Sequence, residues 1–369
     1  MNAISKLGMG MMRLPQTDGQ IDLGTTKQMA DLYLKAGGNW FDTAWGYHNG
    51  KSEPTVHDAV VARHPRASFR VATKLPVWLV KAPGDAERLL QEQLSRTGAG
   101  YFDRYMLHAL NEARLPALES LGVWDFLKSV KARGLAKSIG FSFHDTADVL
   151  EQILAKHPEA DFVQLQINYL DWEDASVQSR LCYETARAHG VDVIIMEPIK
   201  GGVLGALPEQ AARPLRALHP DWSDARWALS FCLSLDGVST ILSGMSEPAH
   251  VTDNIATFQN FEPLNAEEMA ALKEAVTILH AMPSIACTAC GYCVENCPQR
   301  IKIPDIFETA TGVMRFGPQP GLIGHYEWLV SEGSGRASDC IACQACEGHC
   351  PQHLAIASLM TDCAALLDR

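Results

Sequence analysis

The sequence predicts an α/β fold, a (β/α)8 TIM barrel, followed by a smaller, mainly α-helical region. Short apolar segments rich in β-branched and aromatic residues alternate with helix-like segments from the N-terminus to about residue 280. Eight such pairs over roughly 250 residues describe a closed barrel of parallel strands. A cysteine-rich segment then begins, and it repeats itself once before the C-terminus.

The eight predicted strands are short and apolar, as buried strands are. They cover residues 7–12, 40–42, 69–74, 101–108, 138–143, 162–166, 191–196 and 238–243. Helical periodicity predicts helices at 25–36, 86–97, 121–133, 146–156, 177–189, 224–235, 250–257 and, closing the barrel, 265–280. Gly37, Gly134 and Gly190 follow three of these helices, where C-cap glycines are expected. We therefore expect a barrel domain over residues 1–280 and a second domain over 281–369.

The second domain contains two runs of the form C-x2-C-x2-C-x3-C-P. This spacing is the one that holds [4Fe–4S] clusters, with three cysteines on one cluster and the fourth on its neighbour. The sequence therefore predicts two [4Fe–4S] clusters with crossed ligation. One would be held by Cys287, Cys290, Cys293 and Cys350, and the other by Cys340, Cys343, Cys346 and Cys297.

Zinc and disulfides are the alternatives. Structural zinc usually takes two separated ligand pairs, which these compact runs do not resemble. Residues 1–15 have no apolar segment of the secretory type, and no stretch is apolar enough to span a bilayer. We therefore expect a cytoplasmic protein with reduced thiols available to metal. The other cysteines, Cys182, Cys232 and Cys363, are expected to be small buried hydrophobes.

The two runs begin at Cys287 and Cys340, a spacing of 53 residues. The segment between them is longer than a compact hairpin ferredoxin needs, and the sequence from Pro304 opens like a helix with proline near its first position. A small, mainly helical ferredoxin-like iron–sulfur domain is the resulting prediction.

Length and charge narrow the function classes. The chain has 369 residues, 47% hydrophobic content and a net charge of −12 at pH 7. It exceeds one ordinary domain and can fill a large core. The acidic balance argues against binding to nucleic acid or to an anionic membrane surface. It fits a soluble protein, with a basic one-electron redox partner as a further option.

Four polar residues fall where three neighbouring strands end. Asp42, Lys74 and His108 end their predicted strands, and Tyr47 follows Asp42 in the next loop. Singly, each has an ordinary explanation: a turn aspartate, a solvated lysine, a hydrogen-bonded histidine. Because the carboxyl ends of barrel strands form one rim, their joint placement favours catalysis.

The chemistry of these residue types is consistent with carbonyl reduction. Hydride transfer to a carbonyl needs a proton donor, and the ordinary pKa of tyrosine, about 10, is too high to be ideal. A neighbouring Lys74 ammonium is expected to lower the pKa of Tyr47, and Asp42 to hold that lysine charged. A neutral His108 would orient the carbonyl oxygen.

The set Asp42, Tyr47, Lys74 and His108, with its DTA-x-x-Y and LH motifs in order, resembles the tetrad of the aldo-keto reductases. The resemblance covers roughly residues 1–280, and segments 140–143, 163–168 and 241–254 match later landmarks of that family. The whole chain resembles a branch that carries two C-terminal ferredoxin motifs. The resemblance implies a (β/α)8 barrel that binds NADPH or NADH across its mouth.

The same resemblance implies nicotinamide contacts for particular residues. Ser142 and Gln164 match the carboxamide contacts, and Lys200, Gly201 and Gly202 follow a strand where backbone N–H groups meet phosphates. The adenosine phosphates are expected at Ser243, Gly244, Met245 and Asn254. Met196 occupies the place of the ring-stacking aromatic residue, and His250 that of the arginine that pairs with a 2′-phosphate. Glu197 would repel the phosphates unless it is turned away.

The leading hypothesis is an oxidoreductase that reduces or oxidises a small carbonyl or alcohol with NAD(P)H. Its clusters would link it to a one-electron redox partner. The alternative is an electron-transfer or redox-sensing protein on a barrel whose nicotinamide binding is weakened. Binding of NAD(P)H, followed by fluorescence, discriminates between the two.

Overall fold

The computed structural model describes residues 3–175, 177–287, 289–294, 296–350 and 352–368. Its packing divides the chain into two compact units. The first comprises Met1–Ile199 and Ala225–Met269, and the second comprises Lys200–Asp224 and Ala270–Arg369. These units follow packing and not chain order, so a domain boundary at residue 280 stays a prediction.

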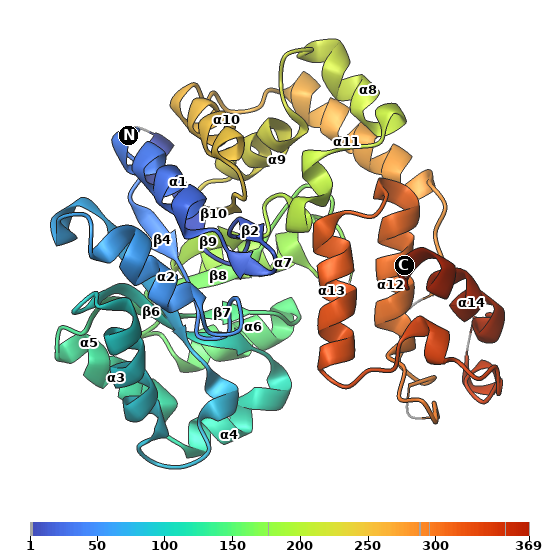
Figure 1. Ribbon diagram of the computed structural model, residues 1–369, viewed down its shortest axis with the longest axis horizontal. Coiled ribbons are helices and arrows are strands. Elements are labelled where there is room, and N and C mark those ends of the chain that lie inside the picture. The colour runs from blue at the N-terminus through green and yellow to red at the C-terminus, as the bar shows by residue number, and fades with distance from the viewer. Residues whose placement is uncertain (1–2, 176, 288, 295, 351, 369) are drawn as a thin grey trace. The chain divides into compact units, whose positions relative to one another are not determined.

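The first unit is built on a closed barrel of eight parallel strands (Figure 1). The strands follow one another around the barrel in chain order, and the last pairs with the first. They are β1 (Leu7–Gly10), β4 (Trp40–Asp42), β5 (Arg70–Leu75), β6 (Phe102–Leu110), β7 (Ala136–Phe143), β8 (Phe162–Gln166), β9 (Asp192–Met196) and β10 (Val238–Gly244). The predicted (β/α)8 barrel is confirmed.

The barrel is packed with side chains from six of its strands. They form one buried cluster of Trp40, Ala72, Met106, Phe162, Ile194 and Leu242. Strand β7 contributes a glycine at this level, because a Cβ on Gly140 would overlap the carbonyl oxygen of Phe162. The guanidinium of Arg104 lies over the rings of Trp40 and Phe162 and donates a hydrogen bond to Thr240.

Helices surround the strands of the first unit in Figure 1. Asp22 caps the first helix by accepting a hydrogen bond from the Thr25 backbone at 2.9 Å. Gly37, Gly134 and Gly190 have positive φ, as C-cap glycines require. The helices are α1 (Leu23–Lys35), α2 (Ser52–Val56), α3 (Asp85–Thr97), α4 (Leu115–Ser120), α5 (Val123–Ala132), α6 (Ala147–Lys156), α7 (Ser179–Ala188), α10 (Pro248–Gln259) and, beyond its first residue, α9 (Asp224–Leu233).

A small hairpin lies between the first strand and the first helix. It pairs β2 (Gln16–Thr17) with β3 (Gln20–Ile21) across Asp18 and Gly19, which both have positive φ. Two central residues of positive φ define a type I′ turn, for which Asp-Gly is a favoured sequence. The sequence analysis missed this signal because the two strands are only two residues long.

In the second unit, the described residues contain helices and turns but no strand, which agrees with the predicted mainly helical domain. Three of its helices, α8, α13 and α14, were not predicted. The helices are α8 (Glu209–Leu218), most of α11 (Ala266–Ala281), α12 (Ile303–Phe316), α13 (Pro320–Ser331) and α14 (Ile356–Leu367). Short 3-10 turns precede α8 at η6 (Lys200–Gly205) and lie between α13 and α14 at η7 (Ala337–Asp339) and η8 (Glu347–His349).

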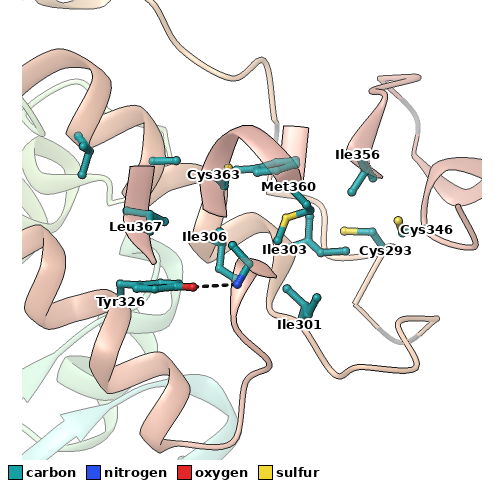
Figure 2. Packing of buried hydrophobic residues seen from close by; sticks show 14 residues of the cluster. Cys293, Ile301, Ile303, Ile306, Tyr326, Cys346, Ile356, Met360, Cys363 and Leu367 are labelled. Atoms are coloured by element: carbon teal, nitrogen blue, oxygen red, sulfur yellow. Dashed lines mark hydrogen bonds between the residues drawn. The ribbon is translucent and has the colours of Figure 1, made fainter. Parts of the chain in front are cut away.

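The second unit has its own apolar core, drawn in Figure 2. Cys293 and Cys346 lie at one end of this core beside Ile356, and Tyr326 lies at the other. The Tyr326 hydroxyl accepts a hydrogen bond from the Ala337 backbone at 2.8 Å and donates one to Asp368 at 2.6 Å. These bonds fasten the end of the chain after α14 to α13 and η7.

The three cysteines outside the runs behave as predicted. Cys182, Cys232 and Cys363 are buried with free thiols. Within the described part of the chain, no helix is both long enough and apolar enough to cross a membrane.

Helix α13 packs closely on η6 within the second unit. A Cβ on Gly321 would overlap the carbonyl oxygen of Gly201, a backbone atom that cannot move aside alone. Gly324, one turn further along the same helix, has nothing within 4 Å of its Cβ position. The two glycines therefore stand in different surroundings although they share a helix.

We predict opposite effects of alanine at these positions. Gly324→Ala should be neutral or raise the free energy of unfolding by up to about 1 kcal/mol, since alanine is the better helix former. Gly321→Ala should lower it by about 1–3 kcal/mol, because the added methyl overpacks the contact with η6. Denaturant unfolding followed by circular dichroism measures both. Equal effects would contradict the close approach.

Candidate functional site

The buried pair of Lys74 and Asp42 forms the centre of the candidate site. Strands β4, β5 and β6 are neighbours in the barrel, so their carboxyl ends lie side by side. The Lys74 ammonium donates hydrogen bonds to Asp42 Oδ1 at 2.5 Å and to the Thr43 carbonyl at 2.9 Å. Both side chains are almost fully buried.

Tyr47 and His108 complete the group. Lys74 Nζ lies 4.8 Å from the centre of the Tyr47 ring. The rings of Tyr47 and His108 are nearly perpendicular, with their centres 6.0 Å apart. The structure thus brings together all four residues that the sequence analysis placed on one rim.

Burial and the charge of the partner shift the pKa values of Lys74 and Asp42 in opposite directions. Burial alone disfavours the ammonium, but the Asp42 carboxylate and Tyr47 together raise the pKa of Lys74 above its usual value. Burial likewise raises the pKa of Asp42, against the opposing effect of Lys74. The lysine is therefore held in its charged form at neutral pH.

Tyr47 departs from the sequence-based expectation. Burial raises the pKa of Tyr47, and the lowering effect of Lys74 only partly offsets it. The expected net lowering is therefore wrong in this structure, because the sequence could not reveal how strongly this phenol is shielded from water. Tyr47 consequently holds its proton at neutral pH, as a proton donor must.

His108 is a neutral imidazole. Burial holds the pKa of His108 well below its usual value, and the nearby Lys74, His144 and Arg114 lower it further. Its Nδ1 is buried without a hydrogen-bond partner. A neutral ring of this kind can hydrogen-bond to a carbonyl without transferring charge.

Trp78 is a site residue that the sequence analysis missed. Its ring lies 5.1 Å from that of His108, centre to centre, and the residue is exposed. The Arg114 guanidinium lies on its ring, 5.8 Å from the centre. The available signal was an aromatic residue four positions after Lys74.

The two predicted carboxamide contacts are buried, Ser142 near the end of β7 and Gln164 in the middle of β8. Ser142 Oγ accepts a hydrogen bond from the Ala109 backbone at 2.7 Å. Gln164 donates to the Met196 sulfur at 3.4 Å, while its Oε1 is buried without a hydrogen-bond partner. Buried amide oxygens rarely stay unpaired, so this atom fits the N–H group of a carboxamide.

The predicted adenosine-phosphate contacts surround the end of β10 and the start of α10. Asn254 donates to Ser243 Oγ at 2.7 Å, and both residues are buried, as is Met245. Exposed His250 stands in the first turn of α10, where its Nδ1 accepts a hydrogen bond from the Ser246 backbone at 3.3 Å. A helix N-terminus favours anions, which fits a phosphate group.

Glu197 is paired with a cation that was not anticipated. Its Oε1 lies 3.2 Å from Nη2 of Arg13, a residue that follows β1. The Arg13 side chain also covers Gly244, at 3.1–3.3 Å from the Cβ position there. The expected repulsion of phosphates by Glu197 is therefore offset by a positive charge at the same place.

Lys200, Gly201 and Gly202 fall in the second unit, in η6. All three have positive φ, which gives an irregular turn with exposed Gly202. Within its own unit, this turn packs against α13. That its residues share a phosphate site with Ser243 and Gly244 stays a prediction.

The eight cysteines of the two runs surround two cavities of the second unit. The cavities have empty volumes of about 320 and 360 Å3, open solvent included. Each is lined by three cysteines of one run and the fourth cysteine of the other. The first has Cys287, Cys290, Cys293 and Cys350, and the second has Cys340, Cys343, Cys346 and Cys297.

Ile303 and Ile356 line both cavities, so the two sites share an apolar wall. Burial raises the pKa of the Cys293 thiol to about 11 and also raises that of Cys346. Such thiols are protonated at neutral pH unless a metal displaces the proton. Among the described residues, no three His, Cys, Asp or Glu side chains converge on a single metal ion.

The chain was compared with known protein families. The model of the "Aldo/keto reductase family" matches residues 6–277, and that of the "4Fe-4S dicluster domain" matches residues 286–355. The first match covers well over half of the chain, and the second contains both cysteine runs.

Individual relatives agree with the first match. The chain is 27% identical over 326 residues to an NADH-specific methylglyoxal reductase of Escherichia coli, covering 74% of this chain and 96% of the relative. It is 24% identical over 304 residues to an L-galactose dehydrogenase of Arabidopsis thaliana, covering 76% of this chain and 92% of the relative.

Solved structures share the barrel. An aldo-keto reductase from Bacillus halodurans, in its holo form, has a TM-score of 0.60 at 24% identity, covering 73% of this chain and 91% of that one. An aldo/keto reductase from Klebsiella pneumoniae, in complex with NADP and acetate, also has a TM-score of 0.60, at 18% identity with 73% and 90% coverage. With its eight-stranded barrel and the match over residues 6–277, this chain belongs to the aldo/keto reductase family.

Proposed function

We propose that the chain interconverts a small carbonyl compound and its alcohol with NADPH or NADH, and that Tyr47 donates the proton. The observation that carries the proposal is the buried Lys74–Asp42 pair, whose ammonium lies 4.8 Å from the centre of the Tyr47 ring, with the neutral ring of His108 also next to Tyr47. Membership of the family and the methylglyoxal reductase among the relatives support it.

The nicotinamide, when bound, would supply or accept the hydride. During reduction the carbonyl oxygen gains negative charge, and the Tyr47 hydroxyl gives it a proton. The Lys74 ammonium, kept charged by Asp42, stabilises the phenolate left on Tyr47 until solvent returns the proton. His108 donates a hydrogen bond to the same carbonyl oxygen and fixes its direction. In oxidation, the proton moves in the opposite sense.

The cofactor contacts are proposed from burial and charge. Gln164 and Ser142 would hold the carboxamide, with Met196 beside the ring. Ser243, Gly244, Met245, Asn254 and His250 would surround the adenosine end, with Arg13 supplying positive charge, and Lys200, Gly201 and Gly202 would offer backbone N–H groups to phosphate. The unpaired Gln164 oxygen supports the carboxamide contact.

We further propose two [4Fe–4S] clusters with crossed ligation in a domain covering 281–369, after a barrel domain covering 1–280. The lining of the two cavities supports this grouping of cysteines. The clusters, when bound, would carry single electrons to or from a redox partner. A cytoplasmic location, where thiols stay reduced, is part of the proposal.

The role of Tyr47 predicts a specific loss. Tyr47→Phe should lower turnover at least ~10²-fold, because it removes the proton donor and leaves the ring in place. The affinity for NAD(P)H, followed by fluorescence, should change little. Methylglyoxal with NADH and with NADPH provides the probe reactions.

Tyr183→Phe is the matched control, since that hydroxyl donates to the Asp236 carbonyl. Wild-type turnover in Tyr47→Phe would remove the proposed proton donor. Absence of NAD(P)H binding in the wild type would favour the electron-transfer or redox-sensing alternative.

Crossed ligation predicts the effect of removing cysteines in pairs. Anaerobically purified wild type should contain about eight irons per chain. The double variant Cys287→Ala/Cys350→Ala should lose one cluster and keep about four irons with the EPR signal of one reduced cubane. If each run held its own cluster, this variant would damage both. Cys363→Ala is the control that keeps all the iron, and stoichiometric zinc in the wild type would contradict the proposal.

A further inference from the structure

Glu53 is a fully buried carboxylate that the proposed reaction does not use. It stands in α2, which follows the loop of Tyr47. Its Oε1 accepts hydrogen bonds from Thr73 Oγ1 and from Gln93 Nε2, both at 2.7 Å. Its Oε2 lies 3.6 Å from Arg96 Nη1 without a hydrogen bond. Burying a carboxylate costs free energy unless it is paired and hydrogen-bonded. The residues that this carboxylate holds in place therefore indicate what it does.

The Oε1 bonds hold the strand that carries Lys74. Thr73 precedes Lys74 in β5, and side chains of successive strand residues point to opposite faces. Thr73 therefore faces α2 and α3 while Lys74 faces Asp42. Gln93 of α3 also donates to the Lys74 backbone carbonyl at 3.0 Å and accepts from the Tyr105 hydroxyl at 2.9 Å. Glu53 and Gln93 thus hold the backbone of Lys74 from the face of β5 opposite to its ammonium.

The Oε2 side reaches the loop that carries Tyr47. The guanidinium of Arg96 lies 3.7 Å from the centre of the Trp45 ring, two residues before Tyr47. Arg96 is held in this place by Glu92, whose Oε1 accepts a hydrogen bond at 2.6 Å, and by the charge of Glu53. A cation over an indole face is favourable, so Arg96 fixes Trp45 and with it the loop.

We propose that Glu53 is a positioning residue that holds Lys74 and Tyr47 in register. It does so through Thr73 and Gln93 on the side of β5, and through Arg96 and Trp45 on the side of the loop. This inference rests on the proposed roles of Tyr47 and Lys74. The contacts of Glu53 go to Thr73, Gln93 and Arg96, so its effect on Tyr47 and Lys74 is on their geometry.

The relative position of Lys74 and Tyr47 affects catalysis because the ammonium acts on the phenol by electrostatics, without a covalent link. The interaction between the ammonium and a phenolate weakens as their separation increases. Small displacements of catalytic groups can cost large factors in rate. Loss of the Glu53 charge removes one of the two carboxylates that hold Arg96 and so loosens Trp45 and the Tyr47 loop, while the hydrogen bond from Thr73 can persist to a glutamine oxygen.

The test compares Glu53→Gln and Arg96→Met with the wild type. Protein labelled with ¹³Cζ-tyrosine gives one NMR signal per tyrosine, and Tyr47→Phe assigns the signal of Tyr47. The Tyr47 signal should shift or broaden in both variants at pH 7, and the signal of Tyr326 should not. With methylglyoxal, kcat should fall at least about fivefold while the KM for the cofactor stays within about twofold.

Glu87→Gln is the matched control, since Glu87 lies on α3 but pairs with Arg133 at the surface. If Glu53→Gln does not fold, the result for Arg96→Met decides. The Arg96 side chain is partly exposed, and without it Glu53 Oε1 still accepts its hydrogen bonds from Thr73 and Gln93. An unmoved Tyr47 signal in a folded variant would overturn the proposal and leave Glu53 a purely stabilising residue. A wild type without turnover would contradict the proposed function, and the NMR comparison would still decide the role of Glu53.

Discussion

The buried ion pair of Lys74 and Asp42 is the interaction on which the proposed site depends. An ammonium and a carboxylate removed from water are stable only as a close pair with further hydrogen bonds, here to the Thr43 carbonyl. The pair exists because β4 and β5 are hydrogen-bonded neighbours in a register that matches Asp42 with Ala72, two residues before Lys74 on the same face of β5. The register of the barrel therefore controls the charge that faces Tyr47.

The sequence predicts the barrel well and parts of the second unit poorly, for a physical reason. Barrel strands are buried on both faces, so they stand out as apolar segments, and the predicted bounds of all eight lie within two residues of the observed ones. Helix α13 was missed because its glycines suggest a break. Gly321 serves the close contact with Gly201 instead, which no local pattern reveals.

The convergence of the four rim residues follows from chain order on a barrel, and so it could be predicted. Their protonation could not, because the pKa of Tyr47 depends on burial that only the folded structure defines. Arg13 and Glu53 escaped notice for a similar reason. Arg13 has its partner Glu197 far away in the chain, and Glu53 acts through residues of two other elements.

The central claim is that Asp42 keeps Lys74 charged and thereby maintains the proton donor. The pH dependence of kcat for carbonyl reduction in Asp42→Asn tests it most directly. Asp42 raises the pKa of Lys74 and that of Tyr47, so its neutralisation should lower both. Activity requires both groups protonated, and the loss of activity with rising pH should therefore begin at lower pH than in the wild type. An unchanged basic limb, or one moved to higher pH, would contradict the account.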